Sequence, residues 1–208
     1  MDDRAEQEVS PAHRRAASNA ATVYTIGHSV RPIDSFLALL ARHGIRHVVD
    51  VRRYPGSRRH PQFGPAALAS SLRDAAIAYS QVPELGGRRA AAPDSPNAGW
   101  RNASFRGYAD YMSTGEFGAA LDRLCSHARA ERTAIMCAEA LPWRCHRSLI
   151  ADALVARGHA VFHIMDAELR PHALPSFARL DGDRVTYPGG GKGGAAPDLF
   201  AEKGDEDG

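Results

Sequence analysis

The 208-residue sequence predicts a single α/β domain built on a mostly parallel β-sheet with helices on both faces. Short runs of β-branched residues alternate with stretches of helical period from Val23 onward. This alternation is typical of β-α-β crossovers, which make neighbouring strands parallel and lay helices over the sheet. Hydrophobic residues make up 44% of the chain and charged residues 24%, a balance that suits one globular domain with a full core.

The predicted domain spans residues 21–188. The segments 1–20 and 189–208 are rich in Ala, Gly and charged residues and have no apolar period, so we predict that both tails are disordered. No apolar run is long enough to cross a bilayer, and the N-terminal segment lacks a signal-peptide core. Three cysteines, in a chain long enough to fold without disulfides, indicate free thiols and a cytoplasmic protein.

The first half of the domain is expected to contain three strands and two helices. The strands are predicted over residues 23–29, 47–52 and 77–82. Pro32 suits the first position of a helix after the first strand, and Gly44 ends that helix. Pro65 opens a second helix, because Leu68 and Leu72 follow at helical spacing.

The second half begins with a stretch of Pro, Gly, Asn and Ser without a period. We predict a long loop over residues 83–107, and loops of that length inside compact domains are usually functional or mobile. A helix with Phe117, Leu121 and Leu124 on one face follows. The remaining predicted elements are a strand over 132–137, a helix over 145–158, a strand over 160–165 and a short edge strand over 184–187.

The residues that need a functional explanation follow the predicted strands directly. They are Gly27, His28 and Ser29; Asp50, Arg52 and Arg53; Glu84, Gly86, Gly87, Arg88 and Arg89; Cys137 and Glu139; and, opening the next helix, Cys145, His146 and Arg147. The carboxyl ends of parallel strands lie along one edge of a sheet, and ligands bind at that edge. We therefore expect His28, Arg52, Glu139 and Cys145 to meet in a single site.

Several of these residues belong to motifs that occur in a characteristic order and spacing: TIGHS, a helix ending in HGI, VVDVRRYPGSRR, PELGGRR, YADYM and MCAEALPWRCHRS. With these motifs the chain, from about Tyr24 to Ile164, resembles the uncharacterised family called domain of unknown function 488. The resemblance implies a bacterial or archaeal soluble α/β domain. It implies no particular activity, so the function has to be argued from the site.

Cys145 and Cys137 are candidate catalytic residues. Cys145 opens a predicted helix, where backbone N–H groups and the helix dipole favour a thiolate, and its polar loop should leave it reachable by solvent. The alternative is that Cys145 is a small buried hydrophobe, as most lone cysteines are. Cys137 is either buried at the end of an apolar strand or faces Cys145 across the loop. Cys125 lies on an apolar helix face and is assigned to the core.

Glu139 and His28 are the other candidate catalytic residues. Glu139 is either a general acid or nucleophile, or the ion-pair partner of an arginine. His28 follows a tight turn at Gly27 and is either a general acid–base or a histidine satisfied by backbone groups. Asp50 is interpreted as structural, holding Arg52 or capping a loop.

Two loops rich in arginine and glycine predict an anion site. The candidate binding residues are Arg52, Arg53, Ser57, Arg58, Gly86, Gly87, Arg88, His146 and Arg147. Guanidinium groups suit bidentate binding of phosphate or carboxylate, and glycines let backbone N–H groups approach the same anion. The alternative is a solvated charged surface. The aromatic residues Trp100, Phe105, Tyr108 and Tyr111 either belong to the core or form a stacking surface for a nucleotide.

These observations predict an enzyme, a hydrolase or transferase using Cys145 or Glu139, that acts on a phosphorylated or nucleotide-like anion. The chain has no P-loop, no G-x-G-x-x-G after a strand and no HExxH, which argues against the usual nucleotide hydrolases, Rossmann dehydrogenases and zincins. One alternative is a binding module for nucleic acid or nucleotides with structural cysteines. The other is a metal site built from His28, Cys137, Cys145 and His146, although the sequence assigns no metal, no cofactor and no oligomeric state.

Overall fold

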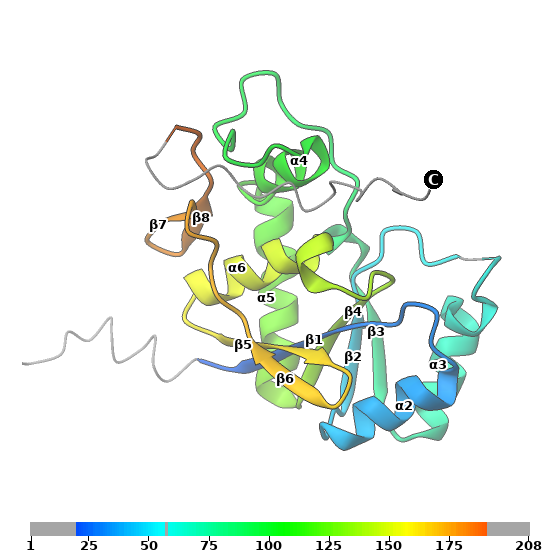
Figure 1. The fold of residues 1–208 in the computed structure, drawn as a ribbon. Helices are drawn as coiled ribbons and strands as arrows, with labels where there is room; N and C mark the ends of the chain where they lie inside the picture. Colours follow the sequence, from blue (N-terminus) through cyan, green and yellow to red (C-terminus); the bar gives the residue numbers. More distant parts are fainter. Residues whose placement is uncertain (1–19, 57, 191–208) are drawn as a thin grey trace, which may run out of the picture.

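The computed structural model describes residues 20–56 and 58–190, and its centre is a six-stranded sheet (Figure 1). The strand order is β3-β2-β4-β1-β5-β6, in which the first five strands are parallel and β6 is antiparallel to β5. The strands are β1 (Thr22–Gly27), β2 (His47–Asp50), β3 (Ala78–Gln81), β4 (Thr133–Cys137), β5 (Ala160–Met165) and β6 (Glu168–Pro171). This arrangement confirms the predicted mostly parallel sheet.

Helices cover both faces of this sheet (Figure 1). On one face, α2 (Ile33–Arg42) and α3 (Pro65–Asp74) pack through Phe36, Leu40, Leu68 and Leu72 onto β1, β2 and β4. On the other face lie α5 (Gly115–Ala130) and α6 (Arg147–Ala156), with α4 (Ala103–Tyr111) beside α6. Every residue of β2 and β4 is buried, as expected for central strands covered on two sides. The fold is therefore the predicted single α/β domain.

Two segments differ from the sequence prediction. The expected loop over 83–107 contains a short 3-10 turn at Pro83–Leu85, and its end belongs to α4, which starts at Ala103. Asn102 caps α4 because its Oδ1 accepts hydrogen bonds from the N–H groups of Ser104 (2.9 Å) and Phe105 (3.2 Å). The expected edge strand over 184–187 is β8 (Arg184–Thr186), which pairs with β7 (Arg179–Asp181) in a separate two-stranded sheet.

The two tails predicted to be disordered lie outside the described residues, apart from residues 20, 189 and 190. The candidate binding residue Ser57 also lies outside them. Within the described part of the chain, none of the helices is both long and apolar enough to span a membrane.

Gly27, the last residue of β1, lets the loop after β4 lie directly against the strand end. A methyl group added at Gly27 would overlap the carbonyl of Glu139 and come within 2.9 Å of the Cα of Ala140. Since both obstacles are backbone, we expect Gly27→Ala to lower the free energy of unfolding by about 1–3 kcal/mol. Urea unfolding measures this change.

The matched control is Gly118→Ala, within α5, where the nearest atom to an added methyl group is 3.9 Å away. This variant should be neutral or gain up to about 1 kcal/mol, because alanine favours a helix more than glycine does. Equal stabilities for Gly27→Ala and the parent would contradict the close packing at the end of β1.

Candidate functional site

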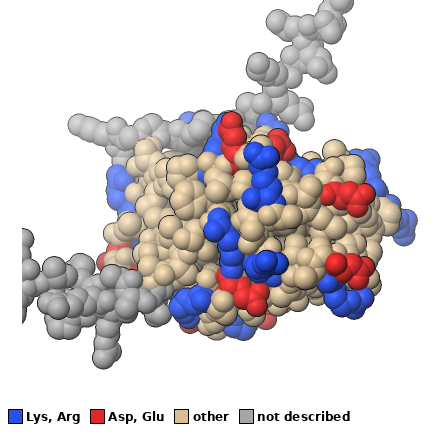
Figure 2. All heavy atoms as spheres, turned by 90° about the horizontal axis from the view of Figure 1, so that it is seen from below, with Lys and Arg blue, Asp and Glu red and all other residues tan. Residues whose placement is uncertain are grey.

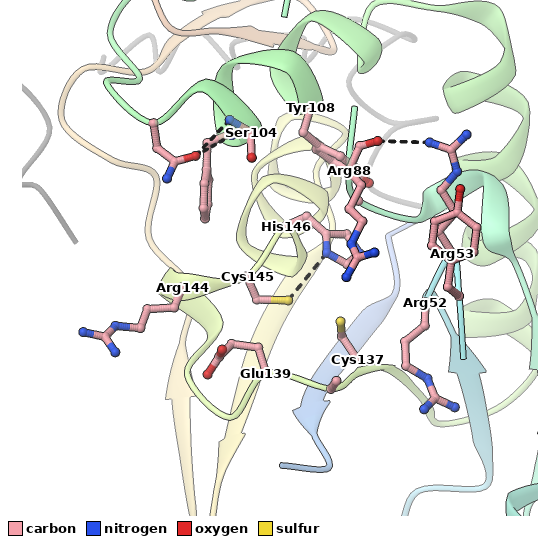
Figure 3. A pocket seen from close by; sticks show the side chains of 15 residues that line it. Arg52, Arg53, Arg88, Ser104, Tyr108, Cys137, Glu139, Arg144, Cys145 and His146 are labelled. Atoms are coloured by element: carbon pink, nitrogen blue, oxygen red, sulfur yellow. Dashed lines mark hydrogen bonds between the residues drawn. The ribbon is translucent and has the colours of Figure 1, made fainter. Parts of the chain in front are cut away.

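A cavity of about 490 Å³ opens at the carboxyl edge of the sheet, beyond the ends of β2 and β4 (Figure 3). Its walls also come from the segment after β3, the N-terminus of α4 and the turn before α6. The lining residues are Arg52, Arg53, Tyr54, Gly87, Arg88, Asn102, Ser104, Phe105, Tyr108, Cys137, Ala138, Glu139, Arg144, Cys145 and His146. Segments distant in sequence thus meet where the strand order predicts.

A pair of cysteines with a neighbouring histidine lies in the wall of this cavity. The donor atoms of Cys137, Cys145 and His146 all lie within 4.8 Å of one another, and in Figure 3 the two sulfur atoms point toward each other. The Nδ1 atom of His146 is 3.6 Å from the Sγ of Cys145, and its Nε2 donates to the carbonyl of Val51 (3.2 Å). Since a carbonyl oxygen can only accept, Nε2 carries a proton. Nδ1 is the ring nitrogen that lies next to the sulfur. Cys137 therefore faces Cys145 across the loop, one of the two arrangements expected.

Cys145 differs from expectation in its position and exposure. Helix α6 begins at Arg147, so Cys145 lies two residues before it, at the end of the 3-10 turn Pro142–Arg144. Its exposed fraction is 4%, and that of Cys137 is 9%. The thiol is therefore less exposed than expected, although it still lines the cavity.

Arg147 is a fully buried cation next to this thiol. Its Nε donates to the Sγ of Cys145 (3.4 Å), its Nη1 to the hydroxyl of Thr25 (3.2 Å), and its Nη2 to the carbonyl of Glu139 (2.5 Å). All the nitrogen atoms of the guanidinium therefore bind protein groups. Arg147 does not line the cavity, so the structure places it behind the sulfur and not among ligand-binding side chains.

The two cysteines have opposite pKa shifts. For Cys145, burial favours the neutral thiol, but a hydrogen bond from Cys137 and the positive charges of Arg147 and His146 outweigh burial and hold the pKa well below its usual value. For Cys137, donating a hydrogen bond to Cys145, together with burial, raises the pKa well above its usual value. These opposite shifts favour a thiolate at Cys145 beside a neutral thiol at Cys137.

His28 lies at the same edge but outside the cavity. Its ring stacks on Phe63 at a centroid distance of 4.1 Å, its Nδ1 is 2.8 Å from the carbonyl of Ser29, and its Nε2 is 3.3 Å from Nη1 of Arg52. Burial lowers the pKa of His28 to about 4, so the ring is neutral near pH 7. A neutral ring that donates to Ser29 and accepts from Arg52 has both nitrogens satisfied, which is the backbone-satisfied alternative for this residue.

Arg52 borders the cavity, and most of its donors are used by protein groups. Its Nη2 forms a 2.6 Å ion pair with Asp50 and also donates to the carbonyl of Phe63, and its Nε donates to the same carboxylate at 2.8 Å. The Asp50 side chain is 1% exposed, and it also accepts from the hydroxyl of Tyr79 at 2.9 Å. Asp50 thus holds Arg52, the structural role expected for it, and each guanidinium nitrogen of Arg52 already contacts a protein group.

The other predicted anion-binding residues divide into two groups. Arg53 and Arg88 are exposed at the cavity, and Arg53 donates to the carbonyl of Arg88 (3.0 Å). Gly87 also borders the cavity, where an added Cβ would lie 3.0 Å from His146. The residues outside are Gly86, whose missing side chain lets the loop pack on Arg53, and Arg58, which is exposed elsewhere.

Several lining residues were not predicted as site residues. Tyr54 lies within 5.8 Å of the guanidinium carbons of both Arg53 and Arg88. Asn102 and Ser104 belong to the unexpected start of α4, whose N-terminal end contributes partial positive charge. Arg144, the residue before Cys145 in the chain, also borders the cavity. The signal for α4 was the N-cap residue Asn102 followed by an aromatic helical pattern.

Among the described residues, Cys137, Cys145 and His146 are the group that could together hold a metal ion. The fourth residue of the expected metal cluster, His28, is not part of this group. Two sulfur donors and one imidazole suit a soft or borderline cation such as Zn²⁺.

The fold and the cavity define a class of protein: a parallel α/β domain with its candidate site at the carboxyl edge of the sheet. Within that class, the chain belongs to the family described as "Domain of unknown function DUF488", whose family model matches residues 32–154. This finding confirms the family expected from the sequence motifs. No curated protein and no solved structure matches the chain.

Proposed function

We propose that this protein is an enzyme, a hydrolase or transferase, that acts on a phosphorylated or nucleotide-like anion with Cys145 as its nucleophile. The observation that carries the proposal is the juxtaposition of a thiolate with positive charge in one cavity. Cys145 lies in the wall of that cavity, and Arg53, Arg88 and Arg144 are among the residues that line it. Guanidinium groups bind phosphate and carboxylate oxygens, and a thiolate attacks electrophilic atoms.

The proposed reaction has two steps. The sulfur of Cys145 forms a bond to the electrophilic atom of the bound anion, and the leaving group departs with the electrons of the broken bond. Water or a second substrate then takes the group from sulfur, which regenerates the thiolate. Glu139, in the wall of the same cavity, is the carboxylate that exchanges protons with the leaving group and the incoming nucleophile.

Protection of Cys145 from alkylation tests the proposed anion site. Inorganic pyrophosphate should slow the reaction of iodoacetamide with Cys145 in a saturable manner, and the effect should weaken as salt rises because exposed charges are screened. Arg88→Gln and Arg144→Gln should each raise the half-protecting concentration about tenfold, the loss that one hydrogen bond to a charged group carries. Peptide mass spectrometry reads the alkylation of each cysteine.

Arg59→Gln is the control for these variants, because Arg59 is an exposed arginine that does not line the cavity. It should leave the half-protecting concentration unchanged. If pyrophosphate does not protect Cys145, or if Arg59→Gln weakens protection as much as the cavity variants, the anion site does not exist as proposed.

Two alternatives give different results. A nucleic-acid binding module would need an extended basic surface, and the face seen from below in Figure 2 does not carry one, because acidic and basic side chains are interspersed there among uncharged ones. A metal held by Cys137, Cys145 and His146 would block alkylation of Cys145 until a chelator removes it, and elemental analysis of the purified protein would detect it. All three cysteines are free in the structure, in keeping with the reducing cytoplasm that we propose.

A further inference from the structure

Arg147 lacks the carboxylate partner that a buried guanidinium ordinarily requires. Its exposed fraction is 1%, and none of the described acidic residues forms an ion pair with it. Burying an unpaired cation is costly, so the protein must supply negative charge or ordered acceptors around it. The Cys145 thiolate is one such partner, through the 3.4 Å contact with Nε. The carbonyl of Glu139 is a second acceptor, at Nη2, and a third lies on the opposite side, at Nη1.

From Nη1 of Arg147, a continuous chain of hydrogen bonds leads through the domain to a buried carboxylate. We call this chain the buried relay; its members are Thr25, His163, His172 and Asp152. Its contacts are Thr25 Oγ1 to His163 Nδ1 (2.8 Å), His163 Nε2 to His172 Nδ1 (2.9 Å), and His172 Nε2 to Asp152 Oδ1 (2.7 Å). The hydroxyl of Tyr187 donates to the other oxygen of Asp152.

The members of the buried relay have little exposed surface, and Asp152, His163 and His172 also line a second cavity of about 290 Å³. Thr25 is 0% exposed, Asp152 1% and His163 8%, and the His172 side chain is 7% exposed. The members come from β1, β5, α6 and the segment after β6, so the relay connects elements that are distant in sequence. Hydrogen bonds in such surroundings are strong, and an unpaired member is costly.

The relay has a consistent direction when its imidazoles are neutral. Burial, together with the nearby His172 and Arg147, lowers the pKa of His163 to about 3, so its ring carries one proton near pH 7. Thr25 accepts from Arg147 and is then free to donate to His163. A neutral His163 can then donate from Nε2 to His172, and a neutral His172 can donate from Nε2 to the Asp152 carboxylate. All the hydrogen atoms then point from Arg147 toward Asp152.

We propose that the buried relay positions Arg147 against the sulfur of Cys145. The relay, which ends at Asp152, holds Nη1 of the guanidinium in place through Thr25. In this orientation Nε donates to the sulfur of Cys145. The members of the relay are positioning residues, because they act on Cys145 only through Arg147. This inference rests on the proposed function, in which Cys145 acts as a thiolate.

The test uses two substitutions of similar size at Thr25. Thr25→Val removes the hydroxyl, whereas Thr25→Ser keeps it. At pH 7, alkylation of Cys145 by iodoacetamide should fall about tenfold in Thr25→Val, the effect of one hydrogen bond to a charged group, and stay within about twofold of the parent in Thr25→Ser. Asp152→Asn, at the far end of the relay, should slow alkylation about threefold.

A second measurement reports on Arg147 directly. The ¹⁵N–¹H resonance of its Nε–H group should shift in Asp152→Asn and in Thr25→Val, and should stay near the parent position in Thr25→Ser. Leu68→Ala is the control for general destabilisation, since Leu68 belongs to the core on the other face of the sheet. It should lower the melting temperature without changing either readout. If Thr25→Val does not fold, Asp152→Asn supplies both readouts.

The two proposals fail in distinguishable ways. If Cys145 of the parent reacts no faster than Cys125, the proposed thiolate chemistry is wrong, and the Arg147 resonance alone then decides on the relay. If that resonance is unchanged in Asp152→Asn, or if folded Thr25→Val alkylates as fast as the parent, the relay does not position Arg147.

Discussion

Cys145 is expected to react with iodoacetamide at least about tenfold faster than Cys125 at pH 7, because it is a thiolate at a pH where ordinary thiols are mostly protonated. The hydrogen bond from Cys137 and the charges of Arg147 and His146 outweigh burial and hold its pKa well below the usual value. For Cys125, burial raises the pKa. The lower intrinsic nucleophilicity of a low-pKa thiolate reduces the difference without reversing it.

The pH dependence gives this prediction its sharpest form. As pH falls from 9 to 7, alkylation of an ordinary thiol slows with its thiolate fraction, whereas the rate for Cys145 should stay nearly constant. Cys137→Ala removes the thiol that donates to Cys145, so the rate should then begin to fall at a higher pH. Cys145→Ser should remove the fast reaction entirely. A rate for Cys145 that follows that of a free thiol across this range would refute the nucleophile, and 8 M urea should make the three cysteines equivalent.

The edge of the sheet at which the candidate cavity lies could be predicted from the sequence, because it depends only on the strands being parallel. In a parallel sheet every strand delivers its next residues to the same edge, so Cys137, Glu139 and Cys145 had to approach the segments that follow β2 and β3. The two helix-covered faces followed from the alternation of apolar strand and helix patterns. None of these predictions needs a knowledge of side-chain partners.

The role of each charged side chain could not be predicted in this way. Three arginines that all follow a strand or open a helix at this edge have different surroundings. Arg52 binds Asp50, Arg147 is buried next to the sulfur of Cys145, and Arg88 lines the cavity. The position of each arginine depends on contacts between residues far apart in the chain. Arg147 and Thr25, whose side chains form a hydrogen bond, are 122 residues apart. The helix start at Asn102 was likewise hidden, because the Gly and Pro residues before it indicate a loop.

Acid should destabilise this protein before its carboxylates titrate, because burial lowers the pKa values of four buried histidines, among them His28 and His163. Burial lowers the pKa of His28 to about 4 and that of His163 to about 3, from a usual value of 6.5. As pH falls below 6.5, the unfolded chain binds protons at these positions while the folded protein does not. The free energy of unfolding should therefore decrease steadily from pH 6.5 to about pH 4, by an amount on the order of 3 kcal/mol for each histidine.

Urea unfolding at pH 7, 6, 5 and 4.5 measures this loss, and His28→Gln isolates the contribution of one residue. Protonated His28 would place a second positive charge against Arg52 and lose the hydrogen bond that Nε2 accepts, and His60 adds further repulsion. The variant should be less stable than the parent at pH 7, because glutamine cannot stack on Phe63 as the imidazole does. The variant should nevertheless lose less stability between pH 6.5 and 4.5, because glutamine at position 28 binds no proton when the chain unfolds. Equal losses in the two proteins would show that His28 binds its proton at the same pH in the folded protein as in the unfolded chain, which is incompatible with its burial against Phe63 and Arg52.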